Sequence, residues 1–90
     1  MNSNYQLPID GNWNTQDIVA VSTMVDDVLS LYESGVDRDR FMKDYQAFLA
    51  VMPAKGEQKS FDRDLKAQTG HQIYQAVKLV QAAPAGKVRA

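Results

Sequence analysis

One long amphipathic segment constrains the fold of this chain more than any other feature of its sequence. Between positions 14 and 35, apolar side chains recur at spacings of three and four, which is typical of one face of an α-helix. These residues are Ile18, Val21, Val25, Val28, Leu29 and Tyr32. Asn14 or Thr15 is placed to cap the helix, and Gly35 is placed to end it. A helix of about 20 residues is roughly 30 Å long, so the rest of a small domain must pack against it.

Three further segments show helical periodicity and are bounded by residues that favour helix ends. The second predicted helix begins at Asp37 and ends before Pro53, because the residue before a proline avoids helical backbone. The third runs from about Ala54 to Thr69, with a weakly specified start, and Gly70 ends it. The fourth covers about residues 71–83. The apolar positions of the three are Phe41, Tyr45, Phe48, Leu49, Met52, Phe61, Leu65, Ile73, Tyr74, Val77, Leu79 and Val80.

The pattern predicts a single all-α domain in which residues 14–83 form a compact array of four helices. Residues 1–13 contain Pro8 and a turn signal, so they are not expected to be helical. Their large apolar side chains are Tyr5, Leu7, Ile9 and Trp13. Leaving these in water is costly, so we expect an extended N-terminal arm packed across the helices. Residues 84–90 lack apolar periodicity and are expected to be a frayed, flexible tail.

Composition limits the classes of function. The chain has no cysteine and one histidine, which excludes disulfides and thiolate metal sites. It shows no signal peptide and no membrane-spanning run of roughly 20 apolar residues, so we expect a cytoplasmic location. Residues 1–52 hold eight acids and three bases, for a net charge of −5, whereas residues 53–90 hold three acids and seven bases, for +4. This asymmetry indicates either a binding face or, the favoured interpretation, weak attraction between two halves of one fold.

The clearest polar pattern is a row of four basic residues on one face of the third predicted helix. Its members are Lys55, Lys59, Arg63 and Lys66. Such a row can contact phosphates, but Glu57, Asp62 and Asp64 dilute its field and the whole chain carries −1. We treat the row as a candidate polar binding face, either solvated or facing an acidic protein surface. Nucleic-acid binding is the less favoured alternative.

The remaining polar groups do not converge on a reaction. Asp26 and Asp27 are adjacent, so they point about 100° apart on a helix, and no further cluster completes a metal site. We interpret them as a solvated acidic face. His71 has Ser60 and Thr69 as nearby hydroxyls, but nothing orients them, so we interpret it as a capping or packing residue. The sequence therefore predicts no catalytic residue, no metal ligand and no cofactor.

Three apolar residues lie off the main stripe of the first predicted helix. They are Val19, Met24 and Leu31. If they are exposed, they form a second apolar strip, which is the candidate surface for a partner or a dimer. The predicted function is a non-enzymatic interaction or regulatory module with an unknown protein partner or a second copy of itself. Nucleic-acid binding through the basic row is the alternative, and no membrane partner is expected.

Four stretches of the chain, in this order and spacing, resemble a known family. They read YQLPIDGNWN (residues 5–14), YESGVDR (32–38), VMPAK (51–55) and TGHQIY (69–74). Together they resemble the YktA-like family, which comprises small uncharacterised proteins of Bacillus-type, low-GC Gram-positive bacteria. The resemblance implies an all-α fold of four helices. It implies no assigned activity, substrate or catalytic residue.

The chain departs from that family pattern at several positions. Leu7 stands where an aromatic residue is usual, and Ala54 replaces a serine that would cap the third helix. His71 stands where tyrosine is expected, which argues against a shared catalytic role at this position. The tail after Ala83 is expected to be particular to this chain.

Overall fold

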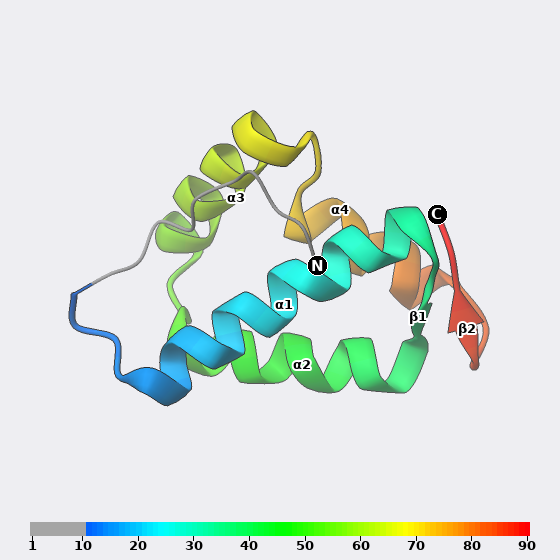
Figure 1. Cartoon of the computed structure of the whole chain (residues 1–90), viewed down its shortest axis with the longest axis horizontal. Helices are drawn as coiled ribbons and strands as arrows, with labels where there is room; N and C mark the ends of the chain where they lie inside the picture. Colours follow the sequence, from blue (N-terminus) through cyan, green and yellow to red (C-terminus); the bar gives the residue numbers. More distant parts are fainter. Residues whose placement is uncertain (1–10) are drawn as a thin grey trace.

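The computed structural model describes residues 11–90. Within them lie four helices and one pair of very short strands. They are α1 (Thr15–Glu33), β1 (Val36–Asp37), α2 (Arg38–Val51), α3 (Lys55–Thr69), α4 (Ile73–Ala82) and β2 (Lys87–Val88). The predicted all-α architecture is confirmed, while the predicted packing of the N-terminal arm over residues 1–10 lies outside the described residues. Figure 1 shows α1 and α2 along the length of the molecule, α3 at one end and the strand pair at the other.

The predicted start of α1 is confirmed by a reciprocal pair of hydrogen bonds. The Asn14 Oδ1 atom accepts from the Asp17 N–H at 2.8 Å, and the Asp17 Oδ2 atom accepts from the Asn14 N–H at 3.2 Å. This capping box satisfies two backbone donors that the helix itself leaves unpaired. Trp13, just before the cap, is half-buried and packs against the core, as expected of an apolar residue beside a helix start.

Gly35, which follows α1, has two structural roles. Its φ angle is +99°, a conformation that side chains with a Cβ atom rarely adopt. A Cβ atom at this position would also lie 2.9 Å from the Val88 carbonyl oxygen of β2. The glycine therefore lets the chain turn and lets β2 approach, and only the first of these roles was visible in the sequence.

The other helix ends follow the sequence in the same way. The Asp37 side chain caps α2 by accepting from the Arg40 N–H at 3.0 Å. No side chain caps α3, whose N-terminal flanking residue is Ala54, and Gly70 ends that helix with a φ of +82°. These observed helix ends confirm the predicted ones. They could be predicted because caps depend on residues only a few positions apart.

The core is built from one broad apolar face on α1 and narrower faces on the other helices. Its buried residues are Val21, Met24, Val25, Val28, Leu31, Phe41, Phe48, Met52, Phe61, Leu65, Ile73, Ala76, Val77, Val80 and Val88. The radius of gyration is 12.4 Å, close to the roughly 12 Å expected of a compact domain of this length. The Phe48 and Phe61 rings meet at a centroid separation of 5.9 Å, which joins α2 to α3.

The predicted apolar partner surface on α1 is wrong. Met24 and Leu31 are fully buried, and only Val19, 56% exposed, faces solvent. Because α1 is covered by both α2 and α4, it buries residues on either side of the predicted stripe. The predicted core face of α4 also needs correction, since Tyr74 and Leu79 are exposed.

The C-terminal segment is not the frayed tail that the sequence predicts. Val88 pairs with Val36 and Lys87 with Asp37 in an antiparallel strand pair, and Val88 is buried. The Ala90 N–H donates to the Leu31 carbonyl at 3.0 Å. These long-range bonds bring residues 87–90 back onto the junction between α1 and α2, so periodicity within the segment could not reveal them.

A side chain of α2 holds the end of α4 in place. The Arg38 Nε atom donates to the Ala83 carbonyl at 3.1 Å, and its Nη2 atom donates to the Gln81 carbonyl at 3.4 Å. The last carbonyls of a helix have no partner within the helix, and a nearby cation suits their negative end. Arg38 therefore links α4 to the start of α2.

Candidate functional site

The basic row on α3 lies on the surface, as its spacing indicated. Lys55, Lys59, Arg63 and Lys66 are all exposed. None of the four forms an ion pair within the described residues. At about 100° per residue, Glu57 and Asp64 lie on the opposite side of α3 from the row. Glu57 and Asp64 therefore dilute the positive field less than the sequence suggested, whereas Asp62 lies on the same side of α3 as the row.

The N-terminal half of this row lines a cleft of about 470 Å³. We call it the α3 cleft, and its lining residues are Tyr45, Lys55, Gln58, Lys59, Asp62, Gln72 and Tyr74. They come from α2, α3 and the start of α4, so the cleft exists only because these elements meet. The structure brings Lys55 and Lys59 into it, whereas Arg63 and Lys66 continue along the exposed side of α3 outside its lining.

Asp62, which lines this cleft, also caps another helix. Its Oδ1 and Oδ2 atoms accept from the Ile73 N–H at 2.8 Å and the Tyr74 N–H at 3.0 Å. Burial raises the pKa of this carboxyl, and the two N–H bonds oppose the rise. Asp62 stands four residues before Lys66 on α3, but it does not pair with that lysine, because the aspartate faces the first turn of α4. That turn has no cap of its own.

The other polar groups of the cleft are fixed or neutral. The Gln58 Nε2 atom donates to the Met52 carbonyl at 2.9 Å and the Pro53 carbonyl at 3.3 Å, which holds the corner between α2 and α3. Burial raises the pKa of the Tyr45 phenol, and the nearby Asp62 and Tyr74 raise it further, so the hydroxyl stays protonated. The two lysine ammonium groups are therefore the cationic groups that the cleft offers to a ligand.

Sequence reasoning found the lysines of the cleft but missed its other walls. Tyr45 was assigned to the core because it shares the apolar periodicity of α2. Gln58 and Gln72 carry no periodic signal at all. A helical pattern shows which residues share one helix face, but it does not show which faces of different helices meet.

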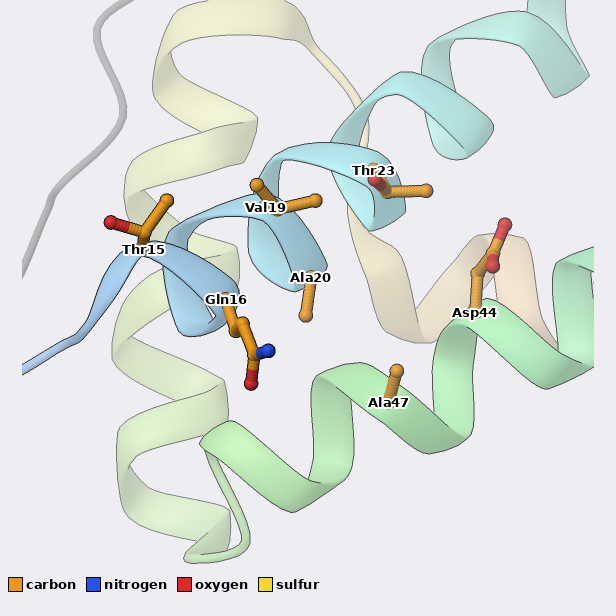
Figure 2. Close-up of a pocket in the computed structure, with 7 residues that line it drawn as sticks. All are labelled: Thr15, Gln16, Val19, Ala20, Thr23, Asp44 and Ala47. Atoms are coloured by element: carbon orange, nitrogen blue, oxygen red, sulfur yellow. The ribbon is translucent and has the colours of Figure 1, made fainter.

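A second, more apolar groove of about 350 Å³ runs between α1 and α2. Figure 2 shows Gln16 and Ala20 pointing from α1 toward α2, with Ala47 and Asp44 pointing back from α2. Val19, the exposed residue of the predicted apolar strip, lies on its rim. Besides these residues, Thr15 and Thr23 line the groove, so it offers small apolar side chains, two hydroxyls, one amide and a single carboxylate.

Near the Asp44 end of this groove the structure buries a carboxyl group that the sequence placed in solvent. Asp26 is exposed as predicted, but Asp27 is only 8% exposed, so the prediction is wrong for Asp27. Burial, followed by the hydrogen bond and charge of the adjacent Asp44, raises the pKa of Asp27 to about 8. Asp27 shares a helix face with Met24 and Leu31, which lie off the predicted buried stripe, so the spacing within α1 gave no signal of its burial.

His71 packs against α1. Its ring stacks on Tyr32 with centroids 3.9 Å apart and planes 8° from parallel. The backbone N–H of His71 donates to the Thr69 Oγ1 atom at 3.1 Å. This is the packing role that the sequence suggested, and the ring faces an aromatic side chain rather than a nucleophile.

The described residues contain no group of three or more His, Cys, Asp or Glu side chains placed to hold a metal ion. Over the same part of the chain, no helix has the length and apolar character needed to cross a bilayer. The fold and surface define a small, single-domain, all-helical protein with a cationic cleft.

Comparison with known proteins assigns this domain to a family. Residues 4–89 match the model of the uncharacterised protein family UPF0223, so the chain belongs to that family. A UPF0223 protein of Streptococcus sanguinis is 32% identical over 88 residues, which cover 98% of this chain and 96% of the relative. A second relative, from Streptococcus thermophilus, is 38% identical over 85 residues, covering 94% and 91%. The predicted membership of an uncharacterised family is thereby confirmed.

Proposed function

We propose that this chain is a non-enzymatic, cytoplasmic interaction module that binds an acidic segment of a partner protein through the α3 cleft. One observation carries the proposal: Lys55 and Lys59 line a cleft and have no ion-pair partner among the described residues. Two ammonium groups one helical turn apart attract a carboxylate, and each remains hydrated until a partner arrives.

The environment of the lysines favours a peptide over a lone ion. Asp62 lowers the positive charge of the cleft, but its two oxygens are engaged by the backbone of α4. The Tyr45 and Tyr74 rings supply apolar walls that can contact the residues flanking an acidic side chain. An acidic segment with an apolar neighbour uses both features, whereas an isolated anion uses only the charge.

Two other partners use the same charges. A second copy of the chain is one source of an acidic segment, since residues 1–52 carry a net charge of −5. Nucleic acid is the alternative favoured by the continuous row, because Arg63 and Lys66 extend the cations of the cleft along α3. A phosphate backbone would engage all four cations, whereas a peptide anchored in the cleft depends mainly on Lys55 and Lys59.

A binding titration tests the proposal and separates these partners. Glutamate-rich peptides containing one aromatic residue, and a single-stranded oligonucleotide, are titrated into labelled protein while amide signals are followed by NMR. The peptide is expected to shift signals of Lys55, Lys59 and Tyr74. The double variant Lys55→Ala/Lys59→Ala is expected to weaken peptide binding about tenfold, which corresponds to roughly 1.4 kcal/mol. The control Lys43→Ala removes an exposed cation of α2 that does not line the cleft, and it is expected to leave the affinity unchanged.

Three outcomes contradict the proposal. Peptide shifts confined to the α1–α2 groove would place binding on a different surface. Oligonucleotide binding that depends on all four cations, with no peptide binding, would select the alternative. Light scattering that shows a dimer, abolished by the double variant, would make a second copy the partner.

We also infer that the YktA-like resemblance and the UPF0223 match describe one group of proteins. Both are uncharacterised families of low-GC Gram-positive bacteria, and the Streptococcus relatives support this inference.

A further inference from the structure

Two carboxyl groups from different helices meet at the junction of α1 and α2. Asp27 on α1 is only 8% exposed, and the side chain of Asp44 on α2 is 21% exposed. The Oδ2 atom of each is fully buried and has no hydrogen-bond donor within the described residues. Two ionised carboxylates present acceptors only, so neither can satisfy the other.

A single proton resolves this arrangement. When one carboxyl is protonated, its O–H donates to the other, and both buried oxygens gain a partner. We propose that Asp27 and Asp44 hold one proton between them and that this proton latches α1 to α2 beside the groove, forming a pH-sensitive device. The inference does not depend on the proposed function, because the pair lies outside the α3 cleft.

The surrounding charges leave the pair dependent on its proton. On α2, the Arg40 Nε atom lies 3.8 Å from the Asp44 Oδ2 atom, but the Arg40 side chain is 74% exposed and therefore well solvated. On α1, the exposed Asp26 adds a negative charge nearby. Arg40 favours the ionised form of Asp27, and Asp26 disfavours that form. Because these two effects oppose each other, the buried oxygens still need a shared proton as their hydrogen-bond donor.

The pair makes stability fall as pH rises. Burial, the main cause, together with Asp44 raises the pKa of Asp27 to about 8, from an ordinary value of 3.8. A raised acid pKa means that the folded state binds a proton which the unfolded state has released. The stabilisation is fully present below about pH 4, declines between pH 4 and 8 and is lost above pH 8. Above that point both groups are ionised, and their repulsion acts across the α1–α2 junction.

The variant Asp27→Asn tests the latch, because an amide N–H donates to Asp44 at every pH. Urea unfolding is measured from pH 5 to 9 for the wild type, for Asp27→Asn and for the matched control Asp26→Asn. The wild-type midpoint is expected to fall by about 1–2 M between pH 6 and 8. The Asp27→Asn midpoint is expected to stay nearly constant. Asp26→Asn removes only the smallest contribution to the raised pKa of Asp27, so its midpoint is expected to fall with pH as in the wild type, over a slightly lower pH range.

A second measurement keeps the proposal falsifiable if the variant folds poorly. The ¹³Cγ shifts of the aspartates in the wild-type protein are followed across the same pH range. A titration of Asp27 with a midpoint well above 6, accompanied by a matching response of Asp44, supports a shared proton. A titration of Asp27 near its ordinary value, or an Asp27→Asn midpoint that falls with pH as the wild type does, overturns it.

Discussion

The α1–α2 junction and the α3–α4 junction each bury one aspartate, and they satisfy it in opposite ways. At the α3–α4 junction, Asp62 accepts two backbone N–H groups from the first turn of α4. At the α1–α2 junction, Asp27 faces Asp44, which is another acceptor. Burial is the main cause that raises the pKa of both carboxyls. The backbone of α4 therefore supplies hydrogen-bond donors to Asp62, whereas Asp27 and Asp44 need a shared proton as their donor.

The difference shows that burial alone does not determine the role of an acidic side chain. Asp62 accepts two backbone N–H groups at a helix start, and these bonds oppose the rise that burial causes in its pKa. Asp27 stabilises the fold as a neutral acid, since two nearby carboxylates resist joint ionisation. The same substitution should therefore act differently at the two junctions.

Of the substitutions that test this comparison, removal of the Asp62 side chain is expected to change the free energy of unfolding most. Asp62→Ala leaves the Ile73 and Tyr74 N–H groups without their acceptor at the start of α4. We expect a loss of about 2–3 kcal/mol in the free energy of unfolding, measured by urea denaturation at pH 7. The control Asp64→Ala, on the exposed side of the same helix, should change it by less than about 0.5 kcal/mol. Equal effects of the two variants would show that the Asp62 cap contributes no more stability than an exposed aspartate.

The isosteric change to asparagine should have opposite signs at the two junctions. Asp62→Asn keeps one acceptor oxygen but places an NH₂ group against a backbone donor, so we expect a loss of about 1 kcal/mol at pH 7.5. Asp27→Asn supplies a permanent donor to Asp44, so we expect unchanged or increased stability at that pH. Parallel urea titrations of both variants measure this contrast. A loss of stability in both would contradict the distinction between the two sites.

The smallest expected effect concerns the ion pair at the edge of the α1–α2 junction. Arg40→Ala removes a cation that lowers the pKa of Asp27, so we expect the ¹³Cγ titration midpoint of Asp27 to move upward. The free energy of unfolding should change by less than about 0.5 kcal/mol, because the Arg40 side chain is largely exposed. Lys43→Ala on the same helix serves as the control and should leave the midpoint in place. A downward shift of the midpoint in Arg40→Ala would mean that Arg40 does not lower the pKa of Asp27.

The helices themselves could be predicted because their signals are local. The cap at Asn14, the cap at Asp37 and the stop at Gly70 each involve residues within a few positions of a helix end. The tail could not be predicted, because Val88 pairs with a residue more than fifty positions earlier. Nothing within residues 84–90 encodes that contact.

The same distinction between local and long-range features applies to the candidate site. The basic row was predictable, since a helical period alone places Lys55 and Lys59 on one face of α3. The cleft was not, because Tyr45 and Tyr74 reach it from α2 and α4. The predicted apolar strip failed for a related reason: whether Met24 is exposed depends on how many helices cover α1.

The sequence by itself determined where the helices lie, how most of them begin and end, and that cations line one side of α3. These features follow from side-chain spacing and from backbone preferences over a few residues. Tertiary structure decided which polar groups face each other. Asp26 and Asp27 are neighbours in the chain, yet one is solvated and the other is buried against Asp44. The physical reason is that burial and pKa depend on the helix that packs opposite, and a residue's own segment does not specify that partner.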